Sequence, residues 1–199
     1  MEYSLFTGKM SSKDYLKCAL FALLEQKNIY KITVKELCSR AVVNRSTFYF
    51  HYNSLDAFFQ EVMAEVASGL VEAVESETNP QSILESKEIA CLRYTKWYFH
   101  VHDHADEFRL LLGHNGPNAF RELLLRQGMD WYTQLLSPMM PRFERQIELD
   151  ILVNYVIHAH FGLLEYYLSQ GMRYSPEYMA QQMVNITFVG LCSLFGLQM

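Results

Sequence analysis

The stretch of residues 33–59, TVKELCSRAVVNRSTFYFHYNSLDAFF, constrains the fold more than any other part of the chain. It predicts two short helices joined by a tight turn. Thr33 and Glu36 have the spacing of a capping box, in which each side chain accepts a hydrogen bond from the backbone amide of the other residue, so a helix should begin there. Asn44 can cap a second helix over residues 45–51. Only about three residues then remain for the turn, and helices joined so closely cross steeply.

The side chains of this second helix suit the major groove of DNA. The groove is about 12 Å wide and admits an α-helix that protrudes from the protein surface. Arg45 can donate two hydrogen bonds to guanine or to a phosphate. Ser46 and Thr47 are short enough to let the backbone approach. Tyr49 and His51 can reach phosphate oxygens. The alternative is an ordinary helical hairpin in an all-α domain, whose polar residues are simply solvated.

The longer run TVKELCSRAVVNRSTFYFHYNSLDAFFQEV resembles the N-terminal signature of TetR-type transcriptional regulators, and Thr-Phe-Tyr-x-His-Tyr is its most specific part. The resemblance covers residues 12–62 firmly and the remainder mainly in its helix pattern. It implies a homodimer with a three-helix DNA-binding domain, placed here at residues 1–54, and a helical effector-binding and dimerisation domain at residues 55–199. The predicted DNA-binding residues are Thr33, Asn44, Arg45, Ser46, Thr47, Tyr49 and His51.

Two positions depart from the family pattern. Val42 stands where the turn usually has glycine, so the turn must either avoid a left-handed backbone conformation or accept strain from a β-branched residue. Leu55 replaces a frequent lysine, which removes one phosphate contact and about one unit from the salt dependence of DNA binding. Modest affinity for DNA is therefore expected.

Hydrophobic periodicity predicts helices throughout, and no alternating strand pattern competes, so the predicted fold class is all-α. Phe48 and Tyr52, four residues apart, are expected to face inward and anchor the second short helix. Beyond it, the expected helices run from about residue 54 to 75, with Asn53 or Ser54 as the cap, and then over about 83–101, from Asp103 or Asp106 to 112, and over 118–136, 144–169 and 175–195.

Charge is distributed unevenly along a chain whose formal net charge is −5. Residues 1–58 hold eight Lys or Arg against five Asp or Glu, and the remaining residues hold nine against seventeen. A mildly basic N-terminal part on an acidic remainder suits a protein that presents one end to phosphates. The four cysteines are scattered and lack a Cys-x-x-Cys pairing, which favours free thiols in a reducing cytosol. With no signal peptide or apolar run of membrane length, the predicted location is cytoplasmic, without membrane association.

The sequence lacks the patterns that mark an active or metal site. Its histidines form no H-E-x-x-H motif, His158 and His160 would point about 200° apart on a helix, and no Cys/His cluster accompanies them. There is no glycine-rich phosphate loop, nucleophile elbow or defined carboxylate pair. We therefore predict no catalytic residue, no metal, no cofactor and no enzyme activity.

The C-terminal two thirds of the chain is rich in aromatic residues that could line an apolar pocket between helices. The alternative is that each aromatic belongs to the ordinary core. The residues predicted to bind a small apolar or aromatic effector are Tyr94, Trp97, Tyr98, Tyr132, Tyr155, His158, Phe161 and Tyr166.

The last two predicted helices are more apolar than a single core-facing stripe requires, which indicates a homodimer interface through about residues 144–195. Burial of both helices within one subunit is the alternative. The resemblance, together with these features, implies a repressor that binds double-stranded operator DNA and is released by an effector, whose binding tilts the helix starting at Leu55. Two rivals remain: a co-activator or regulator controlled by a protein partner, and a helical carrier or enzyme with a vestigial DNA-binding head.

Overall fold

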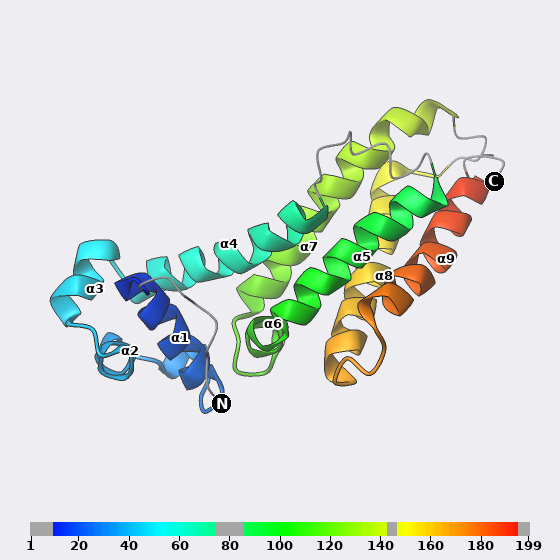
Figure 1. The fold of residues 1–199 in the computed structure, drawn as a ribbon. Coiled ribbons are helices and arrows are strands. Elements are labelled where there is room, and N and C mark those ends of the chain that lie inside the picture. The colour runs from blue at the N-terminus through cyan, green and yellow to red at the C-terminus, as the bar shows by residue number, and fades with distance from the viewer. Residues whose placement is uncertain (1–9, 75–85, 143–146, 195–199) are drawn as a thin grey trace. The chain divides into compact units, whose positions relative to one another are not determined.

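The protein is all-helical wherever its structure, a computed structural model, describes the chain, namely residues 10–74, 86–142 and 147–194 (Figure 1). These residues contain no β-strand, so the predicted fold class is confirmed. The α-helices are α1 Ser12–Leu24, α2 Val34–Ala41, α3 Arg45–His51, α4 Leu55–Val74, α5 Lys87–Asp103, α6 Ala105–Leu112, α7 Asn118–Leu136, α8 Leu149–Ser169 and α9 Pro176–Leu194, with 3-10 turns η1 Ile29–Lys31 and η3 Ser137–Arg142.

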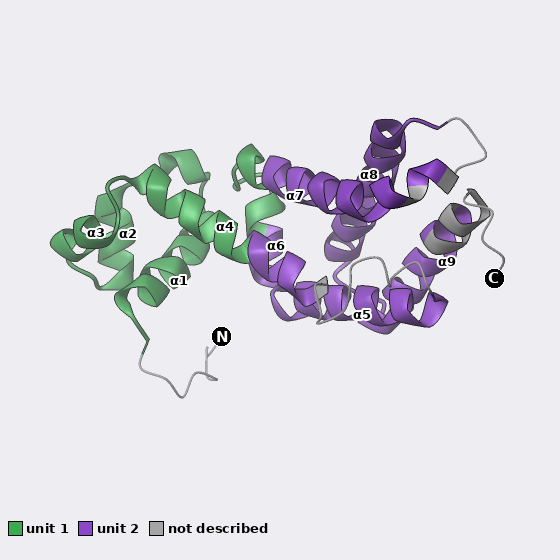
Figure 2. Ribbon diagram, turned by 90° about the horizontal axis from the view of Figure 1, so that it is seen from above, with its two compact units in different colours: residues 1–66, 110–120 green, residues 67–109, 121–199 purple. Residues whose placement is uncertain are grey.

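The chain divides into two compact units (Figure 2). Unit 1 comprises residues 1–66 and 110–120, and unit 2 comprises residues 67–109 and 121–199. The segment 110–120 joins unit 1 through its loop, because the Asn115 carbonyl accepts from the Ile29 amide at 2.8 Å and the Asn115 side chain donates to the Leu24 carbonyl at 2.9 Å. Helix α4 contributes residues to both units. The predicted boundary between a DNA-binding domain, residues 1–54, and a ligand-binding domain, residues 55–199, stays a prediction.

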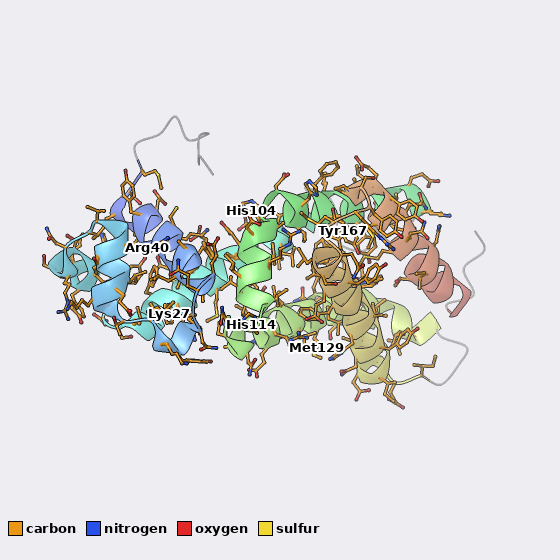
Figure 3. All side chains as sticks on the ribbon, turned by 90° about the horizontal axis from the view of Figure 1, so that it is seen from below. Lys27, Arg40, His104, His114, Met129 and Tyr167 are labelled. Carbon is orange, nitrogen blue, oxygen red and sulfur yellow. The ribbon has the colours of Figure 1, made fainter. Side chains whose placement is uncertain are left out.

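Local capping signals set where the helices of unit 1 begin. Ser11 and Asp14 form a capping box at α1, and Thr33 and Glu36 form the predicted one at α2. Glu36 also pairs with Lys27, which Figure 3 labels. Lys27 and Thr33 both donate hydrogen bonds to this carboxyl, which lowers its pKa. Ser54 caps α4 by accepting from the Ala57 amide at 3.0 Å. The two expected cap sites at Thr33 and Ser54 are thus confirmed.

The turn between α2 and α3 resolves the question that its missing glycine raised. Val42 adopts the left-handed conformation, with φ 55° and ψ 39°, and its side chain is 92% exposed. The amide of Val43 returns to the Cys38 carbonyl at 3.0 Å, which closes the end of α2. The chain therefore accepts the strain instead of avoiding it.

Replacing Val42 by glycine should stabilise unit 1. A left-handed conformation costs an L-residue about 1–2 kcal/mol, which glycine avoids. Part of this gain is lost because glycine gives the unfolded chain more conformational entropy. The exposed valine side chain contributes little burial, so Val42→Gly is expected to raise the free energy of unfolding by about 0.5–1 kcal/mol. Urea unfolding measures this. The matched control is Val43→Gly, which removes a half-buried side chain from a residue without positive φ and should destabilise. Destabilisation by both variants would contradict the strain argument.

Unit 2 is a bundle in which α5 packs along α9. Tyr98 of α5 and Tyr167 of α8 are among its largest fully buried side chains, with ring centroids 5.3 Å apart, and Figure 3 labels Tyr167. Gly171, at φ 68°, follows the end of α8, and Pro176 opens α9, both as expected. Helix α5 has Ser86 as its cap, and the expected start near residue 83 lies outside the described residues, as do residues 144–146. Of the helices described, none combines the length and apolar character that crossing a bilayer requires.

Candidate nucleic-acid interface and effector cavity

Helix α3 is anchored to unit 1 by two aromatic side chains on one face. Phe48 is completely buried and Tyr52 is 5% exposed, as predicted. Both rings contact Phe58 of α4, at centroid distances of 6.0 Å and 5.0 Å. Because aromatic pairs of this geometry add to the free energy of burial, the buried face of α3 is firmly fixed. The opposite face of α3 lies at the protein surface.

A polar cluster fixes the C-terminal end of α3. The Tyr52 hydroxyl donates to the Glu61 carboxylate at 2.9 Å, and the Lys13 ammonium reaches the same oxygen at 2.7 Å. Burial, reinforced by the bond to Glu61, raises the pKa of Tyr52 to about 12, so its hydroxyl remains a donor at neutral pH. The Lys13 hydrogen bond lowers the pKa of Glu61. The cluster connects α1, α3 and α4.

The seven residues predicted to contact DNA lie at or near the surface of unit 1. Thr47 and His51 are half-buried, and the His51 ring nitrogen Nε2 lies 3.0 Å from the Ser12 hydroxyl, which attaches it to α1. The other five are exposed: Thr33, Asn44, Arg45, Ser46 and Tyr49. Asn44 occupies the N-cap position of α3, but its side chain makes no capping hydrogen bond, so the prediction of a side-chain cap there was wrong. DNA contact by these residues stays a prediction.

Phe50 is an exposed residue of α3 that the sequence reasoning missed. Its side chain is 83% exposed, a larger fraction than the 50% of neighbouring Tyr49. The signal was present in the sequence, because two steps along a helix turn by about 200°. Phe50 lies two positions from both Phe48 and Tyr52, so the inward direction of those two residues implies an outward direction for Phe50.

Ion pairs distinguish Arg45 from two lysines of α1. Lys13 pairs with Glu61 at 2.7 Å, and Lys17 pairs with Glu65 at 2.9 Å. Arg45 instead stands exposed in the first turn of α3. A guanidinium at that place has its donors available for a phosphate or for the edge of guanine.

Unit 2 contains a cavity with about 670 Å³ of empty space, its open mouth included. Helices α4, α5, α7, α8 and α9 all contribute to its wall. The lining residues are Leu70, Val71, Tyr94, Trp97, Leu124, Gln127, Gly128, Trp131, Tyr132, Ile157, His160, Phe161, Leu164 and Met183. Among them are four of the eight residues predicted to bind an effector: Tyr94, Trp97, Tyr132 and Phe161.

The other four predicted effector residues lie outside the cavity wall. Tyr98 is fully buried, and its ring meets Trp97 and Tyr167 edge-on. Tyr155 and Tyr166 are 71% and 40% exposed. His158 is exposed and its Nδ1 lies 2.9 Å from the Asn154 carbonyl. The sequence reasoning overlooked Gln127 and Trp131, although the spacing of 124, 127, 128 and 131 marks one face of α7.

A buried chain of hydrogen bonds forms part of the cavity wall. The Tyr94 and Tyr132 hydroxyls lie 2.8 Å apart, Tyr132 reaches His160 Nδ1 at 2.5 Å, and His160 Nε2 reaches the Thr187 hydroxyl at 2.8 Å. One consistent assignment has each hydroxyl donating toward His160 and Nε2–H donating to Thr187. Burial raises the pKa of Tyr94 to about 12 and lowers the pKa of His160 to about 3. All members are therefore neutral near pH 7.

The neutral His160 should make the protein less stable in mild acid. Its pKa falls from 6.5 in the unfolded chain to about 3 in the folded protein, so between these values only the unfolded chain is protonated. The free energy of unfolding is then expected to be about 2 kcal/mol lower per chain at about pH 5 than at pH 7. His160→Gln keeps hydrogen-bonding groups but does not titrate, and should lose this part of the pH dependence. Urea unfolding of both proteins at one protomer concentration tests it, and identical pH dependence would contradict it.

Comparisons with known proteins agree with the all-helical fold and with a regulator that has a cavity in its C-terminal part. The family model for a TetR-type "Transcriptional regulator C-terminal region" matches residues 94–188, which include most of the cavity wall. The uncharacterized HTH-type transcriptional regulator YxbF of Bacillus subtilis (strain 168) is 25% identical over 173 residues. That match covers 86% of this chain and 43% of YxbF, so the chain spans less than half the length of that curated relative.

Solved structures share the fold at low sequence identity. The dihydroxyacetone kinase operon activator DhaS has a TM-score of 0.61 and 12% identity, with 94% of this chain and 99% of that chain covered. NalD, the secondary repressor of the MexAB-OprM multidrug efflux pump in Pseudomonas aeruginosa, has a TM-score of 0.59 and 15% identity, with 90% and 95% covered. Together with the signature at residues 47–52, the matched C-terminal region and the shared fold make the chain similar to TetR-type transcriptional regulators.

Proposed function

We propose that the protein is a repressor that acts in the cytoplasm, where a homodimer binds double-stranded operator DNA through α3 and a small effector in the cavity releases it. The observation that carries the proposal is the two-sided character of α3. Phe48 and Tyr52 fix one side in the core, while Arg45, Ser46 and Tyr49 are exposed on a rigidly held helix. A helix anchored in this way presents base-reading side chains at low entropic cost.

An exposed apolar stripe on α8 supports dimerisation through about residues 144–195. Ile151 is 62% exposed and Tyr155 is 71% exposed, and Ala159, Gly162 and Tyr166 continue the stripe at helical spacing. A Cβ atom added at Gly162 would meet nothing within 4 Å, so this glycine faces outward and leaves room for a partner backbone. Ile186 of α9, also 62% exposed, adds apolar surface. Such a surface is typical of a subunit interface.

Helix α4 supplies a physical link between effector and DNA. Its N-terminal part places Phe58 and Val62 in the core of unit 1, and its C-terminal part places Leu70 and Val71 in the cavity wall. A ligand that fits the cavity in only one orientation of this helix would shift the population of DNA-binding dimers by its differential affinity. Of the alternatives, control by a protein partner would need no cavity, so the cavity favours a small effector.

A gel shift with the DNA upstream of the protein's own gene tests the proposal. We expect a specific shift that weakens steeply between low and moderate salt, because phosphate contacts release counterions. The unlabelled upstream fragment should compete far better than a scrambled duplex. A shift that neither salt nor the scrambled duplex distinguishes would overturn the proposal.

Phe50 is expected to contact a thymine methyl group. An apolar side chain that is 83% exposed on a helix in the major groove has that methyl as its natural apolar partner. Phe50→Ala should weaken operator binding about 5- to 20-fold, and replacing the contacted thymine by deoxyuridine, which lacks the methyl, should weaken it similarly. Combining both changes should cost little more than either alone. Fluorescence anisotropy with a set of single thymine replacements measures this, and strict additivity at every position would contradict the contact.

A further inference from the structure

The described residues that line the cavity in unit 2 carry no formal charge. They include no Asp, Glu, Lys or Arg, and burial keeps His160 neutral. The nearest buried cation in sequence, Arg93, is 2% exposed but is not part of the wall. An ionised ligand group entering this space would lose its hydration without gaining a countercharge, which costs several kcal/mol. The wall therefore selects against ions of either sign.

The polar atoms of the wall differ in how far they are satisfied. Tyr94, Tyr132 and His160 are bonded to one another and onward to Thr187. The side-chain oxygen of Gln127 is buried and accepts no hydrogen bond from any residue that the structure describes. A buried acceptor left unpaired costs about 1–3 kcal/mol, which a ligand that donates to it would recover. Gln127 lines the cavity, and a turn of its side chain would present this buried oxygen to a ligand in an otherwise mostly apolar wall.

The remaining wall is suited to flat or extended apolar groups. Trp97 and Trp131 both line it, and at Gly128 the helix presents no side chain. A Cβ atom at Gly128 would lie 2.9 Å from Cγ1 of Ile157 and press that side chain out of place. The absence of a side chain at residue 128 therefore keeps the shape of the cavity.

We propose that the effector is an uncharged, mainly apolar molecule with one hydroxyl or N–H group, which it donates to the side-chain oxygen of Gln127 while its apolar part lies against Trp97 and Trp131. The proposal rests on the proposed function only in taking the cavity as the effector site. It narrows the effector class to neutral donors and excludes carboxylates and ammonium ions of the same apolar length.

The chain itself provides the probe of occupancy, because both of its tryptophans line the cavity. Intrinsic tryptophan fluorescence of the full-length protein can be titrated with decan-1-ol, decyl methyl ether, decanoate and decyltrimethylammonium at one pH near neutrality and below their aggregation limits. We expect decan-1-ol to bind at least about 10-fold more tightly than either ion, and about 5- to 20-fold more tightly than the ether, which lacks a donor. Equal or tighter binding of an ion, or no response to decan-1-ol, would overturn the proposal.

Variants assign the contact to Gln127. Gln127→Leu has nearly the same size and should abolish the preference for the alcohol over the ether, while keeping the preference for neutral probes over ions. Gln134→Leu, on the same helix and exposed, is the matched control and should change neither. If Gln127→Leu keeps the alcohol preference, the assigned contact is wrong.

Release from DNA is measured separately by adding decan-1-ol to the DNA complex. If decan-1-ol binds the protein as expected but leaves the DNA complex intact, the proposed function is contradicted and the ligand class is not.

Discussion

Arg45→Ala is expected to weaken operator binding on the order of 100-fold or more. A bidentate arginine contact is worth about 1–3 kcal/mol of discrimination, and a dimer loses two of them. The fold should persist, because the Arg45 side chain is exposed and surface substitutions usually change stability by less than about 0.5 kcal/mol. Anisotropy titrations with labelled duplex give the affinity, and thermal unfolding gives the stability.

Arg126→Ala is the matched control for this prediction. Arg126 is an exposed arginine of α7. Its replacement by alanine removes the same charge as Arg45→Ala, but from a helix to which the proposal assigns no DNA contact. Its affinity for the duplex should stay within about 2-fold of the unaltered protein. Equal affinities for Arg45→Ala and the unaltered protein would show that α3 does not read DNA with its first turn.

Placing carboxylates on the α8 stripe should convert the proposed dimer to monomers. Ile151→Glu combined with Tyr155→Glu would bring four carboxylates into a two-fold interface, and each buried, unpaired charge costs several kcal/mol. Because a monomer engages only one half-site, affinity for the operator should fall on the order of 1,000-fold at nanomolar protein. The subunit itself should remain folded, since both side chains are mostly exposed within it.

Size-exclusion chromatography with light scattering measures the mass of this double variant. Leu92→Glu is its control, because Leu92 is a comparably exposed apolar residue, 58% exposed, on α5 instead of α8. The control should run as a dimer and bind DNA normally. A dimeric double variant with unchanged affinity would place the subunit interface elsewhere.

Unit 1 was predictable in detail because its signals are local. The capping box of Thr33 and Glu36 lies within four residues, and the inward direction of Phe48 and Tyr52 follows from helical spacing alone. Val42 was the instructive case. The sequence showed that a glycine was missing, but whether the chain avoids or accepts the left-handed conformation depends on how α2 and α3 pack, which no local rule decides.

The cavity in unit 2 was less predictable because its wall depends on how five helices pack. Tyr94 and Tyr98 share a face of α5, yet only Tyr94 lines the cavity while Tyr98 sits in the core. Tyr155 and Phe161 share α8, yet Tyr155 is exposed and Phe161 is buried in the wall. The sequence analysis did not single out Gln127, because its importance comes from a buried oxygen that has no hydrogen-bond partner among the described residues. Aromatic content indicates that a cavity can exist but not which residues form it.

Selection of binding sites from a random duplex library tests the central claim most directly. A dimer that reads DNA with two α3 helices should enrich inverted repeats whose half-sites are centred about one helical turn, or a multiple of it, apart. The same selection with Arg45→Ala should lose or relax the enriched guanine positions. Enrichment of a single unrepeated site, or of the same sites by both proteins, would contradict the claim that paired α3 helices read the operator.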